Sequence, residues 1–350
     1  SVPFTAPVLL NAYLSTQGDL AAVALQLVLL GVGILVYAPY VRAIHRQAVE
    51  GGTVYLKSFD MTFRGLEEKG RLLELDPVLT AHRALARQAS ALSRIQQISD
   101  YEFYLEYQPQ VSSLTGLCTG CEALMRARDS QGKVHSPWEF LQWLAQARLM
   151  PDVDVWVASQ AVRQYQKWQK IGFALPITIN VSSATLTNPA YGRQLVDILS
   201  LAHGHVSVEI TEDALVGDIQ ATRQMIQKLQ AIGAKVYIDD FGTGFSALSY
   251  LHQFPVDFIK IDRSFVVAQQ DPKGAQVLTG MLRFCEALNL GVVVEGVETA
   301  EQLAFLQSGR GHAGAELIIQ GWYFSKALPG DAVQRFVRER AVKMNDEAGA

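Results

Sequence analysis

Eight short apolar runs, separated by helix-favouring stretches, fill the chain from residue 101 to residue 343 and constrain its fold most strongly. The runs cover residues 103–111, 116–126, 175–182, 205–212, 234–242, 257–262, 291–298 and 316–324. Candidate helices lie between them at 152–170, 219–232, 275–288 and 299–307. Such alternation is typical of a parallel sheet, and eight repeats in about 250 residues match a (β/α)8 barrel. We therefore predict an α/β fold, a TIM-like barrel.

The first two runs depart from this repeat. Only a turn around residues 112–116 separates them, which leaves no room for a helix. A parallel pair of strands needs a crossover connection of a dozen or more residues. We therefore expect irregular first strands and no plain βα unit at this point.

Polar side chains end seven of the eight runs. These side chains are Glu122, Asn180, Glu209, Asp239 with Asp240, Lys260 with Asp262, Glu295 and Gln320. In a barrel of parallel strands these ends share one face, which is where barrel active sites lie. One buried carboxylate alone is as often structural as functional, but seven such ends at one rim favour an active site.

The residue types at these strand ends indicate which metal the site binds. Carboxylate and amide oxygens suit Mg²⁺ or Mn²⁺, whereas zinc sites usually contain His or Cys. None of the seven histidines lies at one of these ends. Crowded acids repel one another, and two divalent ions would neutralise them, as in two-metal phosphoester hydrolases. Lys260 would supply positive charge to the transition state.

The motifs around these residues resemble, in order and spacing, those of EAL-domain cyclic di-GMP phosphodiesterases. They are Glu122-Ala123-Leu124, Asn180-Val181-Ser182, residues 209–212, residues 239–244, residues 260–262, residues 295–298 and Gln320-Gly321. The resemblance implies hydrolysis of cyclic di-GMP to linear pGpG. It also implies a requirement for Mg²⁺ or Mn²⁺, inhibition by Ca²⁺, and a homodimer formed through this domain.

The resemblance also implies a role for each matching position. The first metal would be held by Glu122, Asn180, Glu209 and Asp239, and the second by Asp239, Asp240 and Asp262. Glu295 resembles the general base, and Lys260 would contact the attacking water or the scissile phosphate. Substrate contacts would come from Gln108, Arg126 and Gln320. Glu212 would hold the loop after Asp240 in place, and Glu298 would contact a residue that itself binds the metal or the substrate.

A run of 22 residues without a charge, from Leu20 to Val41, is long enough to cross a bilayer as a helix. Arg42, His45 and Arg46 follow it, and positive residues favour the cytoplasmic side. We therefore expect a membrane segment over residues 1–50, spanning at 20–41, and a barrel in the cytoplasm at the bacterial inner membrane. The alternative is a buried helix of a soluble protein.

Residues 1–50 also resemble the end of a phosphotransferase-system sugar permease of the cellobiose and lactose type, in SVPFTAPVLLNAYLSTQGDLAAVALQLV and YAPYVRAIHRQ. The resemblance implies membrane spans upstream, and because Ser1 is not a methionine we expect a processed product or a fragment. Residues 51–100 are predicted to be a helical linker, which either relays signals or dimerises, or merely packs on the next domain. Residues 344–350 are expected to be a C-terminal tail.

The composition excludes some classes of binding partner and some kinds of structural framework. A formal charge of −4 and a sequence pI near 6.0 leave no electrostatic footprint for a nucleic-acid polymer. Three cysteines, with Cys118 and Cys121 but no second pair, favour a reducing compartment over a disulfide framework or a zinc site. The leading hypothesis is a membrane-tethered cyclic di-GMP phosphodiesterase, and the alternative is a catalytically silent cyclic di-GMP receptor fused to a sugar permease.

Overall fold

The structure is a computed structural model that describes residues 101–243, 251–308 and 316–349. The chain divides into two units, Ser1–Asp76 and Pro77–Ala350, and every described residue lies in the second. The predicted membrane segment and the predicted linker fall outside the described residues, so both stay predictions. Within the described part, no helix combines the length and the apolar character needed to cross a membrane.

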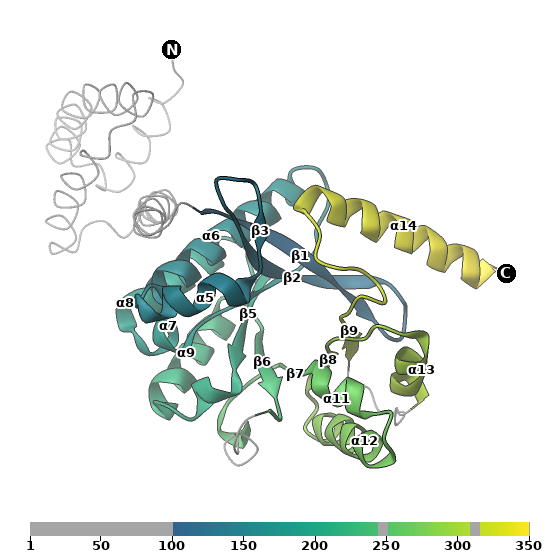
Figure 1. The fold of residues 1–350 in the computed structure, drawn as a ribbon. Coiled ribbons are helices and arrows are strands. Elements are labelled where there is room, and N and C mark those ends of the chain that lie inside the picture. Colours follow the sequence, from purple (N-terminus) through teal and green to yellow (C-terminus); the bar gives the residue numbers. More distant parts are fainter. Residues whose placement is uncertain (1–100, 244–250, 309–315, 350) are drawn as a thin grey trace, which may run out of the picture. The chain divides into compact units, whose positions relative to one another are not determined.

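Eight strands close into a TIM-like barrel (Figure 1). Around the ring they are β1 (Glu102–Ser112), β2 (Cys118–Arg128), β4 (Ile177–Asn180), β5 (Val206–Thr211), β6 (Val236–Phe241), β7 (Phe258–Ile261), β8 (Gly291–Val294) and β9 (Leu317–Ile319). β1 is antiparallel to both of its neighbours, β2 and β9, and the remaining neighbours are parallel. The eight predicted runs form these strands, and the barrel is confirmed. A two-residue strand, β3 (Val134–His135), pairs with β2 outside the ring.

β1 and β2 form a long antiparallel hairpin in place of a βα unit. Their register runs from Glu102 opposite Arg128 to Val111 opposite Cys118. Gly116 lies in the connecting turn with a φ of 68°, a left-handed conformation that glycine adopts without strain. The expected departure of the first two strands from a plain repeat is therefore confirmed.

Helices alternate with the strands along the chain. They are α5 (Pro137–Gln146), α6 (Met150–Gln169), α7 (Ser183–Thr187), α8 (Pro189–Ser200), α9 (Ile219–Ala231), α11 (Arg263–Ala268), α12 (Pro272–Ala287), α13 (Ala300–Ser308) and α14 (Gly330–Gly349), with short 3-10 turns η2 (Glu212–Leu215) and η3 (Leu251–Gln253). The four predicted helices correspond to α6, α9, α12 and α13. α14 continues as far as Gly349, through most of the segment that we expected to be a tail.

The central strands are short, apolar and buried. β4 reads ITIN and β8 reads GVVV, and in both the strand's interior residues are buried. Strands covered on both sides need this pattern, because one side faces the barrel interior and the other faces the surrounding helices. In β4 to β9 the apolar stretch stops at a polar residue at or next to the carboxyl end of the strand, which places these polar groups at one end of the barrel.

Candidate active site

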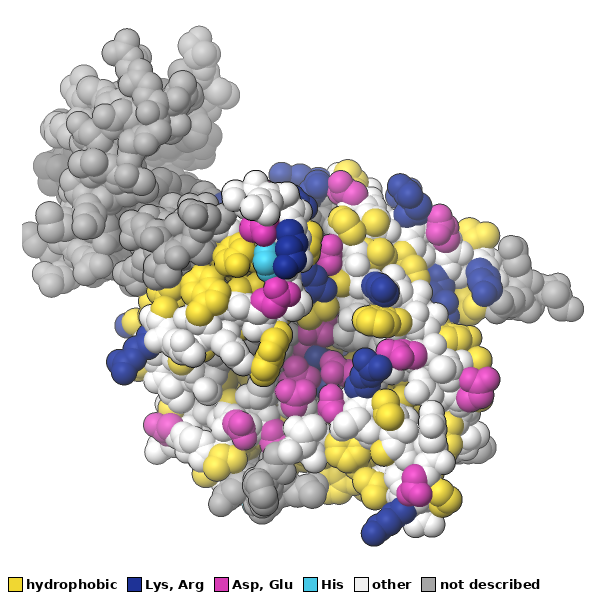
Figure 2. Space-filling view, viewed as in Figure 1, with side chains coloured by type: hydrophobic (Ala, Val, Ile, Leu, Met, Phe, Trp, Pro, Cys, Tyr) yellow, Lys and Arg dark blue, Asp and Glu magenta, His cyan; other side chains and the backbone are white. Residues whose placement is uncertain are grey.

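Polar side chains from five strands, and from the positions directly after two more, meet at one end of the barrel. β2 contributes Glu122, β4 Asn180, β5 Glu209, β6 Asp239 and Asp240, and β7 Lys260, while Glu295 and Gln320 directly follow β8 and β9. Figure 2 shows acidic side chains gathered in the middle of one face of the molecule. The structure therefore brings together most of the residues that the sequence analysis placed at one rim.

The side chain of Lys260 lies at the centre of the site and is 1% exposed. Its Nζ lies 2.5 Å from Glu209, 2.7 Å from Glu295, 3.0 Å from Asp239 and 3.4 Å from Glu122, measured to the carboxylate oxygens. Burial alone would lower the pKa of Lys260, but these carboxylates hold it well above its usual value. The lysine is therefore a fixed cation that compensates part of the surrounding negative charge.

Asp239 and Asp240 are consecutive, yet both serve the site, because β6 carries a bulge. Its register against β7 shifts between Ile238 and Phe241. Asp240 has a φ of 55°, and its backbone N–H donates to Asp239 Oδ1 at 3.0 Å. In a regular strand successive side chains point to opposite faces, and a bulge re-aims them. The bulge therefore lets one strand contribute two carboxylates.

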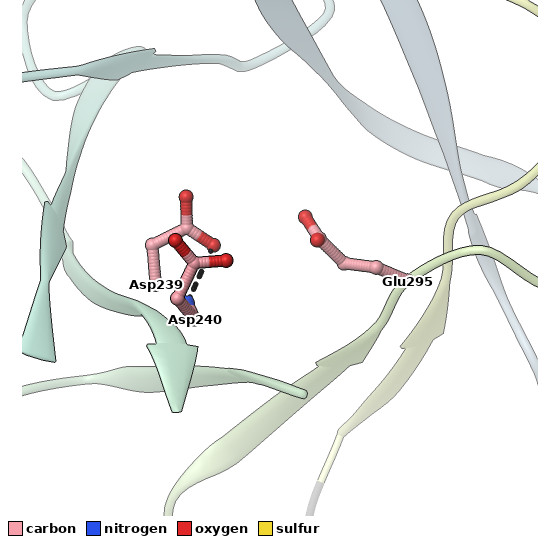
Figure 3. Close-up of side chains that lie close together, drawn as sticks. All are labelled: Asp239, Asp240 and Glu295. Carbon is pink, nitrogen blue, oxygen red and sulfur yellow. Dashed lines mark hydrogen bonds between the residues drawn. The ribbon is translucent and has the colours of Figure 1, made fainter. Parts of the chain in front are cut away.

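Asp239, Asp240 and Glu295 offer carboxylate oxygens that all lie within 4.8 Å of one another. Figure 3 shows Glu295 pointing from the β8 side toward the two aspartates. Burial, reinforced by the charge of Asp239, raises the pKa of Asp240. Burial also raises the pKa of Glu295 to about 7. Carboxylates at this spacing suit a shared divalent cation.

Side-chain amides hold Glu122 in place. Asn180 Nδ2 donates to its Oε1 at 2.7 Å, and Gln320 Nε2 donates to its Oε2 at 2.6 Å. Gln110 Nε2 donates in turn to Gln320 Oε1 at 2.9 Å, and Gln320 Nε2 lies 3.4 Å from Gln108 Oε1. Although burial opposes it, the neighbouring ammonium group and these amides keep the pKa of Glu122 below its usual value. Glu122 is therefore a carboxylate that is held in a fixed position and favoured in its ionised form.

The surroundings of Glu209 indicate whether a cation fits this site. The residue is 0% exposed, and among the described residues its Oε1 has no hydrogen-bond partner. Burial and the neighbouring Glu122 carboxylate raise the pKa of Glu209 well above its usual value. Within the described part of the chain, five carboxylates of this cluster face one ammonium group, that of Lys260. The unpartnered oxygen and the excess of carboxylates fit a hard divalent cation, which prefers oxygen ligands.

Asp262 and Glu298 both contact residues of α11. Asp262 follows β7 and caps α11, since its Oδ1 accepts a hydrogen bond from the Ser264 N–H at 2.9 Å. Burial and the charge of Asp239 are the larger causes of the raised pKa of Asp240, and the charge of Asp262 adds to them. Asp262 therefore lies within electrostatic reach of the cluster. Glu298 Oε1 lies 3.0 Å from Arg263 Nη2.

Two further predicted residues contact backbone groups around the site. Glu212 Oε2 accepts a hydrogen bond from the Gly242 N–H at 2.9 Å, directly after β6. The remainder of that loop, residues 244–250, lies outside the described residues. Gln108 Nε2 donates to the Ser325 carbonyl at 3.3 Å, in the segment after β9.

Three residues that the sequence analysis did not single out support the site. Gln110 is 2% exposed and completes the amide network. Glu106 pairs with Arg126, one of the predicted substrate contacts. Asp154 on α6 accepts a hydrogen bond from the Ser182 N–H at 2.9 Å and so fixes the loop after β4. The alternating polar residues of β1 signalled the first two, whereas nothing local in the sequence signalled Asp154.

The described part of the chain is thus a closed α/β barrel with a buried lysine among carboxylates at one end. The chain belongs to the EAL domain family, whose model matches residues 89–327. The match begins 13 residues before β1 and ends before α14. It agrees with the family resemblance of the motifs.

Named relatives support the same assignment. The chain is 35% identical over 252 residues to cyclic di-GMP phosphodiesterase NbdA of Pseudomonas aeruginosa, covering 69% of this chain and 31% of that protein. It is 31% identical over 242 residues to cyclic di-GMP phosphodiesterase PdeR of Escherichia coli, covering 68% of this chain and 36% of that protein. The chain thus spans about a third of the length of these relatives.

The barrel is also similar to a solved structure, the PaMucR phosphodiesterase in complex with c-di-GMP. The TM-score is 0.62 at 30% sequence identity, and the match covers 72% of this chain and 99% of that chain. That structure therefore matches the barrel over nearly all of its own length.

Proposed function

We propose that this chain hydrolyses cyclic di-GMP to linear pGpG with the help of divalent metal ions. The observation that carries the proposal is the cluster of five carboxylates around the buried Lys260, in a chain of the EAL family. The phosphodiesterase relatives and the c-di-GMP complex of a similar structure support the choice of substrate.

Two metal sites are proposed, for Mg²⁺ or Mn²⁺. The first would be held by Glu122, Asn180, Glu209 and Asp239, and the second by Asp239, Asp240 and Asp262. Bound ions of this kind lower the pKa of water and neutralise charge that develops on a phosphoryl group. Ca²⁺ would inhibit, because its larger and more flexible coordination differs from that of Mg²⁺.

The protein side chains would perform the remaining steps. Glu295 would accept the proton of the attacking water at a carboxylate oxygen, and its pKa of about 7 suits a group that takes up and releases a proton. Lys260 would stabilise the negative charge of the transition state. Gln108, Arg126 and Gln320 would orient the substrate.

Incubation of the full chain with cyclic di-GMP and Mg²⁺, followed by chromatography of the nucleotides, tests the activity. We expect linear pGpG from the wild type, and binding without hydrolysis in Glu295→Gln. A wild type that binds cyclic di-GMP and leaves it intact would contradict the proposed activity and favour a silent receptor. A Glu295→Gln variant that hydrolyses at the wild-type rate would contradict the assigned base.

We also propose that residues 1–50 anchor the chain in the bacterial inner membrane, with the barrel in the cytoplasm and paired with a second copy. The charge-free run at 20–41, with positive residues after it, supports the anchor. The resemblance of this segment to a sugar permease belongs to the same proposal. Membrane fractionation of the full chain against a variant that lacks residues 1–50 tests it, and recovery of both in the same fraction would contradict it.

A further inference from the structure

The β1–β2 hairpin extends beyond the rest of the barrel on the side of the site. β4 pairs with β2 only from Cys121 to Ala123, whereas β2 continues to Arg128 and stays paired with β1 as far as Glu102. Since β2 is parallel to β4, this extra length lies past the strand ends where the catalytic groups gather. Figure 1 shows β1 and β2 as the long strands of the sheet.

One face of this extension belongs to the site. Side chains alternate along a strand, so Leu124, Arg126 and Arg128 share the face of Glu122. On β1, Glu106 shares the face of Gln108 by the same rule. The hairpin therefore places a glutamate and an arginine next to the space above the carboxylate cluster.

Arg126 is held there by two hydrogen bonds. Its Nε donates to Glu106 Oε2 at 2.9 Å, and its Nη1 donates to the Met125 carbonyl at 3.0 Å. The side chains of Arg126 and Glu106 are 17% and 23% exposed, so the pair is largely but not fully covered. A guanidinium group is planar, and bonds at Nε and Nη1 fix that plane. Nη2 keeps its two donors for a ligand, since none of the described residues accepts from it.

We propose that Glu106 is a positioning residue that holds Arg126 ready for an anionic group of the substrate. The inference rests on the proposed function, in which Arg126 contacts the substrate. Glu106 touches no reacting atom; it limits the rotation of a long side chain, so less freedom is lost when the substrate binds. Its negative charge also opposes an anion, so the two effects of Glu106 have opposite signs.

Two substitutions separate these effects. Glu106→Gln keeps an acceptor for Arg126 Nε and removes the charge, whereas Glu106→Ala removes both. If orientation dominates, Glu106→Ala raises KM about fivefold with kcat within about twofold, and Glu106→Gln changes KM by less than about twofold. Loss of the Arg126 Nε–H resonance from the NMR spectrum of Glu106→Ala, but not of Glu106→Gln, would report the freed guanidinium group directly.

The hairpin offers a matched control. Glu102 pairs with Arg128 at 3.4 Å, on the same strands and the same face, but more exposed. Glu102→Ala should leave KM unchanged. In an Arg126→Ala background, Glu106→Ala should have no further effect on KM, because the guanidinium group that Glu106 holds is already absent. A purely structural role for Glu106 would instead lower the melting temperature and leave KM unchanged.

The affinity for cyclic di-GMP in the presence of Ca²⁺, measured by calorimetry, separates this inference from the proposed function. If the wild type binds and Glu106→Ala binds about fivefold more weakly, the positioning role holds even without hydrolysis. Equal binding by the two proteins, or an equal loss in Glu106→Gln and Glu106→Ala, would overturn it. A wild type that neither binds nor hydrolyses the nucleotide would overturn both the inference and the function on which it rests.

Discussion

Replacing Lys260 with methionine tests whether the lysine compensates the carboxylate cluster. Methionine keeps most of the volume of the side chain and removes the one ammonium group that the described residues place within 3.4 Å of Glu122, Glu209, Asp239 and Glu295. Removing one partner of a buried ion pair typically costs about 3–5 kcal/mol. The carboxylates can take up protons in the variant, so we expect the lower end, about 3 kcal/mol. For a domain of this size that lowers the melting temperature by about 10 °C.

The assay is unfolding in urea, with EDTA and then with Mg²⁺. Without metal, the variant should lose about 3 kcal/mol against wild type at about pH 7, and less at about pH 5. The loss is smaller at low pH because carboxylates that no longer pair with Lys260 have raised pKa values in the folded variant. The folded variant then binds more protons than the unfolded chain, and it gains stability as the pH falls. Mg²⁺ should stabilise the variant more than the wild type.

A matched control is Lys228→Met, since Lys228 is an exposed lysine on α9. It should change the free energy of unfolding by less than about 0.5 kcal/mol. If Lys260→Met is as stable as this control in EDTA at about pH 7, the carboxylates do not depend on the lysine and the electrostatic account of the site is wrong.

Three further predictions concern residues around the site. Burial raises the pKa of Asp154 to about 6, so its ionised form is disfavoured in the folded state. The wild type should therefore gain stability as the pH falls from about 7 to about 4.5, and Asp154→Asn should remove about 2 kcal/mol of that gain in urea unfolding. Gln110→Leu leaves Gln320 Oε1 without its donor and should cost about 1–3 kcal/mol of stability; a melting temperature unchanged from wild type would contradict this role. Glu212→Gln weakens the acceptor for the Gly242 N–H, and hydrogen exchange of that amide should speed up about tenfold; unchanged exchange would contradict a role in holding the loop.

The barrel could be predicted from the sequence because its signals are local. An apolar run that ends in a polar residue, as at Glu122 or Glu295, reports both burial and the edge of the sheet. The same is true of the short turn around Gly116, which predicted that β1 and β2 would not follow the common repeat. α5 and α8 were not predicted, although Pro137 and Pro189 open them and are typical first residues of helices.

Other features depend on contacts between distant segments and could not be predicted. The bulge that aims both Asp239 and Asp240 at the site depends on the register of β6 against β7. The pairing of Glu106 with Arg126 depends on the register of β1 against β2. Asp154 reaches the loop after β4 only because α6 packs beside that strand.

The dependence of cyclic di-GMP cleavage on metal, in wild type and in Glu209→Gln, shows whether divalent ions at the carboxylate cluster carry the reaction. We expect EDTA to abolish the formation of linear pGpG and Mg²⁺ or Mn²⁺ to restore it. Glu209→Gln, which removes the buried carboxylate with an unpartnered oxygen, should need far more metal or stay inactive. Cleavage that persists in EDTA, or a Glu209→Gln variant with wild-type metal dependence, would mean that the reaction does not depend on metal ions held by this cluster.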